Sequence, residues 1–458
     1  HIPGMYSDLC AGYAGIQPGQ MEQGMICGSP VTLFSSTHER SHIMMAAGMH
    51  PSAPLTRCTV LVWEGTLGAF YEWHDSGRRL RKHHVMSDPG AKYAALFAIG
   101  DPTFPPQLRY PRPEDAGKLM ALAAYGHPEN ITEPARSTVD YLLSLPQVYP
   151  INKSAFSGSP LFNRGLDDQE LRNAAAYITN RIFEEFFAVA QRVAEPGAPL
   201  VISGGCGLNC DWNERWRESG LFSDVFVPPC TNDSGSAIGT AIDAQFQAGG
   251  DARLAWSVYA GSDFVVDSPP DTRLWKRAPL DVGEIAGRLA MNEVVAWVQG
   301  RCEIGPRALG NRSLLASPLT GRMRDDLNAI KEREAYRPIA PCCRVEEVSR
   351  WFESSAPDPH MLFFSRVLSP ALPAITHVDR SARVQSVTRA DNPRLHDLLT
   401  AFGRRTGYGV LCNTSLNFPG AGFINQLSEL AAYCASRNIR TFVVANNVYS
   451  RVLWHEFL

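Results

Sequence analysis

Short apolar runs alternate with amphipathic stretches along the chain, and this order predicts an α/β protein. Residues 59–63 and 69–73 are apolar runs on either side of a Glu-Gly turn, which predicts a β-hairpin. Between 168 and 194, apolar residues recur at three- and four-residue spacing, which predicts a long helix. A buried strand is then expected at 199–203, ending in two glycines. Helix, strand and glycine turn in this order are typical of α/β folds.

The same pattern predicts two domains. The chain has 458 residues, more than one ordinary hydrophobic core requires. The Pro-rich segment 268–270 interrupts the pattern, and a fresh helix near 282–291 and strand at 294–298 follow it. We therefore expect one domain over 1–271 and a second over 272–458.

Composition and charge narrow the classes of partner. The formal net charge is −3 and no long run of like charges occurs, so no nucleic-acid partner is expected. No uninterrupted apolar stretch of about 18 residues is present, so no membrane partner is expected either. The 11 cysteines are scattered, without paired zinc-type CxxC motifs, and are expected to be reduced thiols of a cytoplasmic protein.

A histidine pair is the first candidate for chemistry. His38 and His42 stand four residues apart in a predicted helix that Ser36 or Thr37 could cap, so both imidazoles share one helical face. Two partly exposed histidines without a ligand are the alternative. Glu64 at a strand end and Asp233 in a glycine-containing loop are candidate carboxylates. A set of two histidines and a carboxylate suits iron, manganese or zinc.

Two glycine-containing loops at strand ends indicate a nucleotide site. Residues 203–209 read SGGCGLN after an apolar strand, and 231–235 read TNDSG. The backbone N–H groups of such loops hold phosphates. The first loop matches neither a Walker loop nor a complete dinucleotide fingerprint, and a tight structural turn is its alternative. Two such turns together favour the nucleotide interpretation.

A basic segment in the second predicted domain indicates an anionic substrate. Residues 300–313 carry three arginines and one glutamate among small, turn-forming residues. A solvated helix face would explain Lys331 and Arg333, but it would not explain arginines placed between glycine and proline. Planar guanidinium groups there suit bidentate binding of phosphate or carboxylate. Residues 413–417 add hydroxyl and amide groups after a predicted strand.

Taken in order, seven motifs resemble those of the NodU/CmcH carbamoyltransferase family, and the resemblance spans nearly the whole chain. The detail around His38 and 63–65 is most similar to the 3-hydroxymethylcephem-type O-carbamoyltransferases of natural-product biosynthesis. The motifs are STHERSH at 36–42, AGKLMALAAYG at 116–126, SGGCGLN at 203–209, GPRALGNR at 305–312, RPIAP at 337–341, THVD at 376–379 and NTS at 413–415.

The resemblance implies a fold and an activity. It implies a Kae1-like N-terminal domain with an actin-like ATPase core, and a YrdC-like α/β C-terminal domain. The C-terminal domain would form carbamoyl adenylate from carbamoyl phosphate and ATP with Mg²⁺. The N-terminal domain would transfer the carbamoyl group to a hydroxyl beside a divalent metal, typically Fe²⁺. The expected function is ATP-dependent O-carbamoylation of a small-molecule acceptor in antibiotic biosynthesis, with a homodimer as the expected oligomer, if any forms.

The resemblance also implies roles for particular residues. Metal ligands would be His38, His42, Glu64 and Asp233, and the catalytic set would combine the two histidines and Asp233 with Arg307 and Arg312. The adenylate in the first domain would contact Lys118, Gly204, Gly205, Asn209 and Gly235. ATP and carbamoyl phosphate in the second domain would contact Lys331, Arg337, Asn413 and Ser415.

The chain departs from the family pattern at two places. Glu64 stands where the broader family has aspartate before glycine. The carboxylate ligand is therefore retained, but on a longer side chain. Family members begin with a strand carrying a Gly-His-Asp segment, and the sequence has no counterpart of it. An N-terminal segment is therefore expected to be missing, and the transfer site without it would be incomplete.

Three other functions compete with this interpretation. A threonylcarbamoyl-type tRNA modification enzyme is disfavoured by the mild acidity and the lack of a basic stripe. A hydrogenase-maturation carbamoyltransferase would carry an acylphosphatase part and zinc-binding CxxC pairs. A non-catalytic nucleotide-binding regulator is disfavoured because it has no use for a carbamoyl phosphate pocket.

Overall fold

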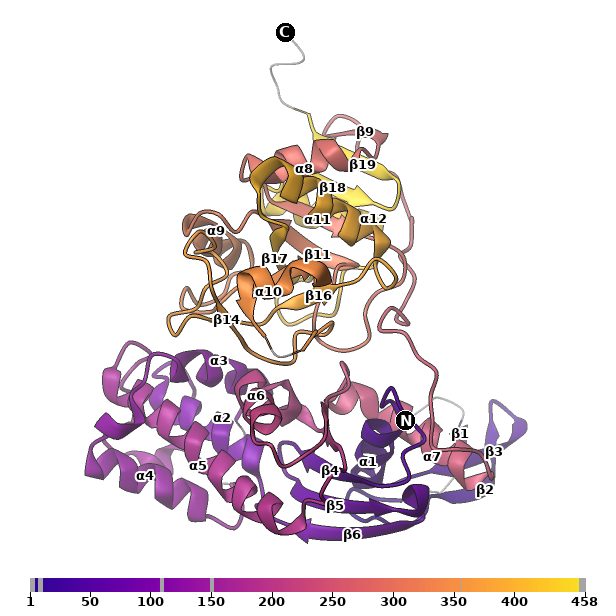
Figure 1. Cartoon of the computed structure of the whole chain (residues 1–458), viewed down its shortest axis with the longest axis vertical. Coiled ribbons are helices and arrows are strands. Elements are labelled where there is room, and N and C mark those ends of the chain that lie inside the picture. Colours follow the sequence, from indigo (N-terminus) through magenta and orange to yellow (C-terminus); the bar gives the residue numbers. More distant parts are fainter. Residues whose placement is uncertain (1–4, 7–10, 108–110, 149–151, 355, 453–458) are drawn as a thin grey trace. The chain divides into compact units, whose positions relative to one another are not determined.

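The computed structural model describes residues 5–6, 11–107, 111–148, 152–354 and 356–452 (Figure 1). It divides the chain into two compact units, His1–Trp256 and Ser257–Leu458. Each unit combines helices with β-sheet, so the expected α/β class is confirmed.

The division falls before Ser257, whereas the sequence pattern placed it at residue 272. The segment between the two positions is bonded to the second unit through its backbone. Ile304 N donates to Val258 O at 2.7 Å, and Leu427 N donates to Val265 O at 3.0 Å. The Pro-rich stretch is therefore a connection inside the second unit, because backbone pairing continues on its N-terminal side.

A five-stranded sheet forms the centre of the first unit. Its strands run in the order β6 (Arg79–His84), β5 (Gly68–His74), β4 (Cys58–Trp63), β7 (Leu200–Ser203) and β8 (Val225–Phe226). The predicted hairpin is confirmed, because β4 and β5 pair antiparallel, and β7 joins β4 in parallel. A separate three-stranded sheet contains β1 (Met5–Tyr6), β2 (Gln20–Ile26) and β3 (Ser29–Ser35).

Helices pack around this sheet. They are α1 (His38–Gly48), α2 (Pro89–Gly100), α3 (Pro113–Ala123), α4 (Glu133–Ser144), α5 (Gln169–Val193), α6 (Cys210–Glu218) and α7 (Ser236–Gln247). The long helix predicted from 168 is α5, and Asp168 caps it by accepting the N–H of Leu171 at 3.0 Å. The face predicted to be apolar is fully buried: Leu171, Ala175, Ile178, Ile182 and Phe186.

At the end of β4, neighbouring side chains point to opposite faces of the sheet. The side chain of Trp63 stacks on Phe186 of α5, with ring centroids 4.6 Å apart. Helix α1 packs against β4 and β7. Val62 pairs with Ser203 across these two strands, so the two side chains lie on the same face of the sheet. This register brings the last residue of β7 toward α1.

The second unit is built on an eight-stranded sheet with a core on each face. The strands are ordered β16 (Gln385–Val387), β12 (Ala340–Arg344), β17 (Val410–Ser415), β11 (Arg312–Ala316), β10 (Val295–Val298), β18 (Thr441–Val444), β19 (Asn447–Arg451) and β9 (Trp275–Pro279). Ala296 and Val298 enter one core, and Val295 and Trp297 enter the other, as period-two alternation requires. A small sheet joins β13 (Phe352–Glu353), β14 (Ser365–Val367) and β15 (Ser381–Ala382).

Four helices cover the two faces of this sheet. Residues of α9 (Arg322–Ile330) and α12 (Leu427–Ser436) enter one core, and residues of α8 (Val282–Ala290) and α11 (Pro393–Thr406) enter the other. The short α10 (Val348–Trp351) precedes the small sheet. Within the described ranges, none of the helices combines the length and the apolarity that crossing a membrane requires.

Candidate active site

Helix α1 carries both candidate histidines. Thr37 caps it, because its hydroxyl accepts the N–H of Arg40 at 3.0 Å, which confirms one of the two expected caps. The four-residue spacing brings the two Nε2 atoms of His38 and His42 to 3.2 Å from each other. The helix therefore presents the histidines as a pair, as the sequence predicted.

Two carboxylates reach the same point from other elements. Nε2 of His38 lies 3.1 Å from Oε2 of Glu64 and 3.7 Å from Oδ1 of Asp233. Nε2 of His42 lies 3.6 Å and 3.4 Å from these two oxygens. The four ligand atoms all lie within 4.8 Å of one another. Atoms bonded to one ion at about 2.1 Å stand about 3.0 to 3.4 Å apart, so this cluster fits a single divalent cation.

The cluster is closed on one side and open on the other. The side chain of His42 is fully buried and that of Glu64 is 5% exposed, whereas that of Asp233 is 73% exposed. The pKa of His38 is raised because Glu64 hydrogen-bonds to its ring, although burial opposes this shift. The pKa of Asp233 is lowered by its hydrogen bond with His42. The raised pKa of His38 and the lowered pKa of Asp233 both indicate that the cluster stabilises positive charge.

Two side chains without a predicted role also touch this cluster. Nδ1 of His42 lies 2.7 Å from Oγ of Ser203, the β7 residue that strand register brings toward α1. A hydrogen bond at Nδ1 fixes the ring so that Nε2 faces a metal. Tyr13 contacts both His38 and Glu64. Ser203 lay inside a recognised motif, but Tyr13 comes from an opening segment without periodicity, which gave no signal.

The glycine loop after β7 has the geometry of a close-approach site. Gly204 has φ +99°, and a side chain there would collide with the backbone of Trp63. Gly205 has no heavy atom within 4 Å of its would-be Cβ, so it borders open space. Gly235 is required for packing instead, because a Cβ would collide with Cys230 and Met45.

Asn209 and Lys118 have other contacts than those expected. Asn209 caps α6, with Oδ1 accepting the N–H of Asp211 at 3.1 Å. Its Nδ2 is buried and has no hydrogen-bond partner among the described residues, so it can still donate to a ligand. Lys118 lies on α3, 3.3 Å from Asp115 and over the ring of Phe97.

The comparisons with known proteins bear directly on this constellation. Residues 28–242 match the model of the carbamoyltransferase N-terminus, and 286–451 match that of the carbamoyltransferase C-terminus. The chain belongs to the carbamoyltransferase family. The four clustered side chains of the first unit all lie within the N-terminal match.

Relatives support the assignment along nearly the whole chain. The enzyme is 52% identical over 450 residues to 3'-hydroxymethylcephem-O-carbamoyltransferase of Amycolatopsis lactamdurans, covering 98% of this chain and 86% of that protein. It is 51% identical to the protein of the same name from Streptomyces clavuligerus, covering 96% and 85%. Nodulation protein U of Sinorhizobium fredii is 41% identical, covering 87% and 75%. Among solved structures, full-length HypF gives a TM-score of only 0.28 at 18% identity, covering 36% and 25%, which carries no argument.

In the second unit of this carbamoyltransferase, Arg312 does not present its guanidinium to a ligand. The residue is 0% exposed. Its Nε donates to Asn425 Oδ1 at 2.8 Å, its Nη1 to the carbonyls of Gln299 and Asn311 at 2.8 and 2.9 Å, and its Nη2 to Gly300 O at 3.0 Å. Burial lowers its pKa. Arg312 therefore holds the backbone of the loop, because protein acceptors use four of its five donors, and its expected catalytic role stays a prediction.

Buried Glu303 holds the other side of this loop. Its Oε1 accepts the N–H groups of Leu309 at 2.6 Å, Asn311 at 2.8 Å and Arg312 at 3.3 Å. Burial raises its pKa. Glu303 and Arg312 therefore fix the turn that carries half-buried Arg307 between them.

The loop meets the end of β17, as expected for one anionic site. Asn413 Nδ2 donates to Ala308 O at 3.3 Å, which places it beside Arg307 in sequence. Lys331 Nζ donates to Ser415 O at 2.7 Å, and to O and Oδ1 of Asn417 at 3.1 and 2.5 Å. Arg337 lies 3.7 Å from Glu334. Lys331 and Ser415 therefore lie close together, although the Lys331 ammonium already donates hydrogen bonds to carbonyl oxygens.

Lys331 belongs to a cluster of cations. Burial, together with the charges of Arg333, Arg337 and Arg437, lowers the pKa of Lys331 to about 7. Burial and the charges of Arg337 and Arg383 lower the pKa of Arg333 to about 9. Mutually repelling cations held together in this way favour an anionic ligand.

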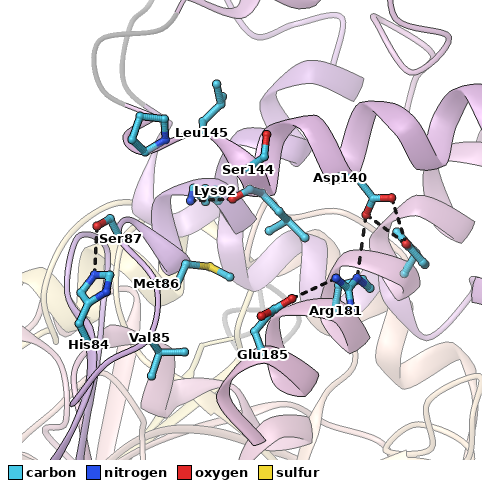
Figure 2. A pocket seen from close by; sticks show the side chains of 13 residues that line it. His84, Val85, Met86, Ser87, Lys92, Asp140, Ser144, Leu145, Arg181 and Glu185 are labelled. Atoms are coloured by element: carbon cyan, nitrogen blue, oxygen red, sulfur yellow. Dashed lines mark hydrogen bonds and ion pairs between the residues drawn. The ribbon is translucent and has the colours of Figure 1, made fainter. Parts of the chain in front are cut away.

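The first unit also contains an open pocket of about 730 Å³ between β6, α2, α4 and α5 (Figure 2). Buried Lys92 donates to Leu143 O at 2.9 Å, near the C-terminus of α4, where carbonyl groups lack helical partners. Arg181 lies 3.9 Å from Asp140 and 3.0 Å from Glu185 (Figure 2). These interactions join the three helices, so the charges of the pocket have a structural explanation.

Proposed function

We propose that this carbamoyltransferase transfers a carbamoyl group from carbamoyl phosphate, through carbamoyl adenylate, to a hydroxymethyl group of a cephem-type antibiotic intermediate. Two relatives more than 50% identical over at least 96% of the chain carry this acceptor in their names. The observation that carries the proposal is the convergence of two imidazoles and two carboxylates in the first unit, within 4.8 Å of one another. ATP, Mg²⁺ and carbamoyl phosphate are part of the proposal.

The two units would divide the reaction. We assign a Kae1-like transfer role to the first unit and a YrdC-like adenylate-forming role to the second. The cations around Lys331 and Arg307 support adenylation, because ATP and carbamoyl phosphate are both anionic. Water is expected to cleave carbamoyl phosphate into carbamate and inorganic phosphate. The carbamate oxygen then bonds to the α-phosphate of ATP, and pyrophosphate leaves.

Adenylation makes the later transfer easier on general chemical grounds. The nitrogen of a carbamoyl group donates electrons into the carbonyl, so the carbon is a poor electrophile without a good leaving group. In the transfer step, the acceptor oxygen forms a bond to this carbon, the bond to AMP breaks, and the acceptor hydroxyl loses its proton. The backbone around Gly204 and Gly205, with Asn209 Nδ2, would orient the adenylate.

The residues present fit a divalent ion. His38, His42, Glu64 and Asp233 would hold it, and Fe²⁺ is the ion that family resemblance favours. Bound there, such an ion would supply Lewis-acid polarisation of the carbonyl. The exposed side chain of Asp233 marks the side from which the acceptor would approach, since the opposite side is closed by buried His42.

A mass-spectrometric acceptor screen tests the function. The enzyme, ATP, Mg²⁺, Fe²⁺ and carbamoyl phosphate are incubated with a 3-hydroxymethylcephem and with amino-sugar, macrolide and amino-acid alcohols. We expect a mass gain of one carbamoyl group on the cephem, and none on the matched 3-methyl cephem. Preferential carbamoylation of another alcohol would contradict the cephem as the acceptor. The absence of a carbamoylated product from every alcohol tested would contradict the proposed function.

Pyrophosphate exchange tests the division between the units. Arg307→Met should lower both carbamoyl phosphate-dependent exchange and product formation about thirtyfold or more. His42→Ala should keep the exchange and lose the product, because His42 contacts Ser203 and Asp233 of the first unit. Loss of exchange in a folded His42→Ala protein would assign the histidine to adenylation and overturn the division.

A further inference from the structure

Tyr13 touches two of the proposed metal ligands at once. Its hydroxyl donates to Oε1 of Glu64 at 2.6 Å and lies 2.6 Å from Oγ1 of Thr66. Its ring stacks on that of His38, with centroids 4.5 Å apart and planes inclined by 15°. Tyr13 remains 48% exposed. Its hydroxyl and its ring each contact one residue of the ligand cluster.

The backbone around Tyr13 is held by the start of α1. The N–H groups of His38 and Glu39, which have no partner inside the helix, donate to the carbonyls of Gly12 at 3.2 Å and Tyr13 at 3.0 Å. Gly15 N donates to Oε2 of buried Glu39 at 2.8 Å. The helix that presents the histidines therefore also fixes the position of Tyr13.

The two oxygens of Glu64 have different partners. Oε1 accepts from Tyr13, while Oε2 is the oxygen that faces His38 and His42. A glutamate has one more rotatable side-chain bond than an aspartate, and fixing that bond costs conformational entropy when a metal binds. A hydrogen bond to the outer oxygen fixes the carboxylate before the metal arrives.

We infer that Tyr13 is a positioning residue for the metal centre, which orients the Glu64 carboxylate through Oε1 and restrains the His38 ring by stacking. This inference rests on the proposed metal site. Outer-sphere hydrogen bonds of this kind typically change metal affinity by about 10- to 100-fold. Tyr13 acts through Glu64 and His38 and is assigned no contact with the reacting atoms.

Metal affinity of the full chain tests the inference. Co²⁺ binding is measured by competition with a chromogenic chelator, and the visible spectrum of bound Co²⁺ reports the ligand geometry. Tyr13→Phe keeps the stacking ring and loses the hydrogen bond, and we expect Co²⁺ to bind about 10- to 100-fold more weakly, with a changed spectrum. Tyr13→Leu, which also loses the stack, should bind more weakly still. Thr66→Val removes the other partner of the hydroxyl and should leave the affinity within about twofold.

A double-mutant cycle separates this inference from the proposed centre. In a Glu64→Ala background, Tyr13→Phe should have no further effect, because the side chain through which Tyr13 acts is absent. The proposed metal centre is supported if the wild type binds Co²⁺ and the His38→Ala/His42→Ala variant does not. With the centre so supported, equal affinities of wild type and Tyr13→Phe would overturn the role of Tyr13 alone. Failure of the wild type to bind Co²⁺ would overturn the centre and the inference together.

Discussion

The ligand cluster of the first unit and the arginine loop of the second use polar side chains in opposite ways. In the cluster, two imidazoles and two carboxylates point their ligand atoms at one another, within 4.8 Å. In the loop, Arg312 points its donors at backbone carbonyls and Asn425. The nitrogen and oxygen atoms of the cluster converge on one point and are atoms that can bind a metal, whereas most donors of the arginine are taken by carbonyl oxygens. Convergence of ligand atoms therefore separates a candidate ligand site from a structural support.

The largest expected effect tests the cluster. His38→Ala/His42→Ala should remove stoichiometric metal from the purified protein, because two of the four proposed ligands are lost. A Lewis acid contributes several kcal/mol of transition-state stabilisation, so acceptor carbamoylation should fall by at least about 10³-fold. Metal content is measured by elemental analysis and turnover by product mass.

His50→Ala is the matched control for this pair. His50 is also buried, but it lies 3.5 Å from Asp224 and outside the cluster. Its substitution should leave metal content unchanged. Full metal occupancy in the double histidine variant would refute the assignment of α1 as the ligand helix.

The next effect contrasts two arginines of one loop. Arg312→Met leaves buried carbonyls without a donor and buried Glu303 without its compensating charge, so we expect a loss of about 3 to 5 kcal/mol in the free energy of unfolding. Arg307→Met should lower that free energy by less than Arg312→Met does, while pyrophosphate exchange falls about thirtyfold or more. Urea unfolding followed by circular dichroism measures the first quantity. Equal stability of the two variants would contradict the structural role of Arg312.

The sequence predicted the first region better than the second. Helical periodicity is enough to bring His38 and His42 together, and strand ends are predictable places for Glu64. The contacts of Arg312 were not predictable, because most of its partners are backbone carbonyls, which every sequence contains. The α/β class and the apolar face of α5 followed from periodicity, whereas the domain division did not, since backbone pairing before the Pro-rich segment leaves no compositional mark.

A smaller effect tests whether burial and the neighbouring arginines destabilise the charged form of Lys331 in the folded chain. The pKa of Lys331 is about 7 in the folded chain and 10.5 without these surroundings. Between these values the unfolded chain binds the extra proton, so the free energy of unfolding rises with pH through this window. The rise is up to about 1.4 kcal/mol per pH unit, and below pH 7 the cost of the buried charge is fully present.

The comparison of wild type with Lys331→Met at pH 6.5 and 8.5 isolates this contribution, because other titrating groups cancel. From pH 6.5 to 8.5 we expect the free energy of unfolding of the wild type to rise by about 1 to 2 kcal/mol relative to that of the variant. An anionic ligand should raise the pKa again, so ATP binding at pH 8 should take up a proton. Calorimetry in buffers of different ionisation enthalpy detects that uptake, and a buffer-independent enthalpy would argue against Lys331 as part of the anion site.

The smallest effect compares one helix cap in each unit. Thr37 caps α1 through Arg40 N, and Asp281 caps α8 by accepting the N–H of Gly283 at 2.7 Å. Replacing either residue by alanine should cost about 1 kcal/mol of stability, the usual value of a cap. Their effects on metal should differ, because the Thr37 hydroxyl also donates to Gly15 O at 2.5 Å and so holds the segment that carries Tyr13. We expect Co²⁺ affinity to fall about two- to fivefold in Thr37→Ala, less than a direct outer-sphere loss would cause, and to stay unchanged in Asp281→Ala. Equal Co²⁺ affinity in the two variants, at equal loss of stability, would show that the start of α1 supports the helix without positioning the metal centre.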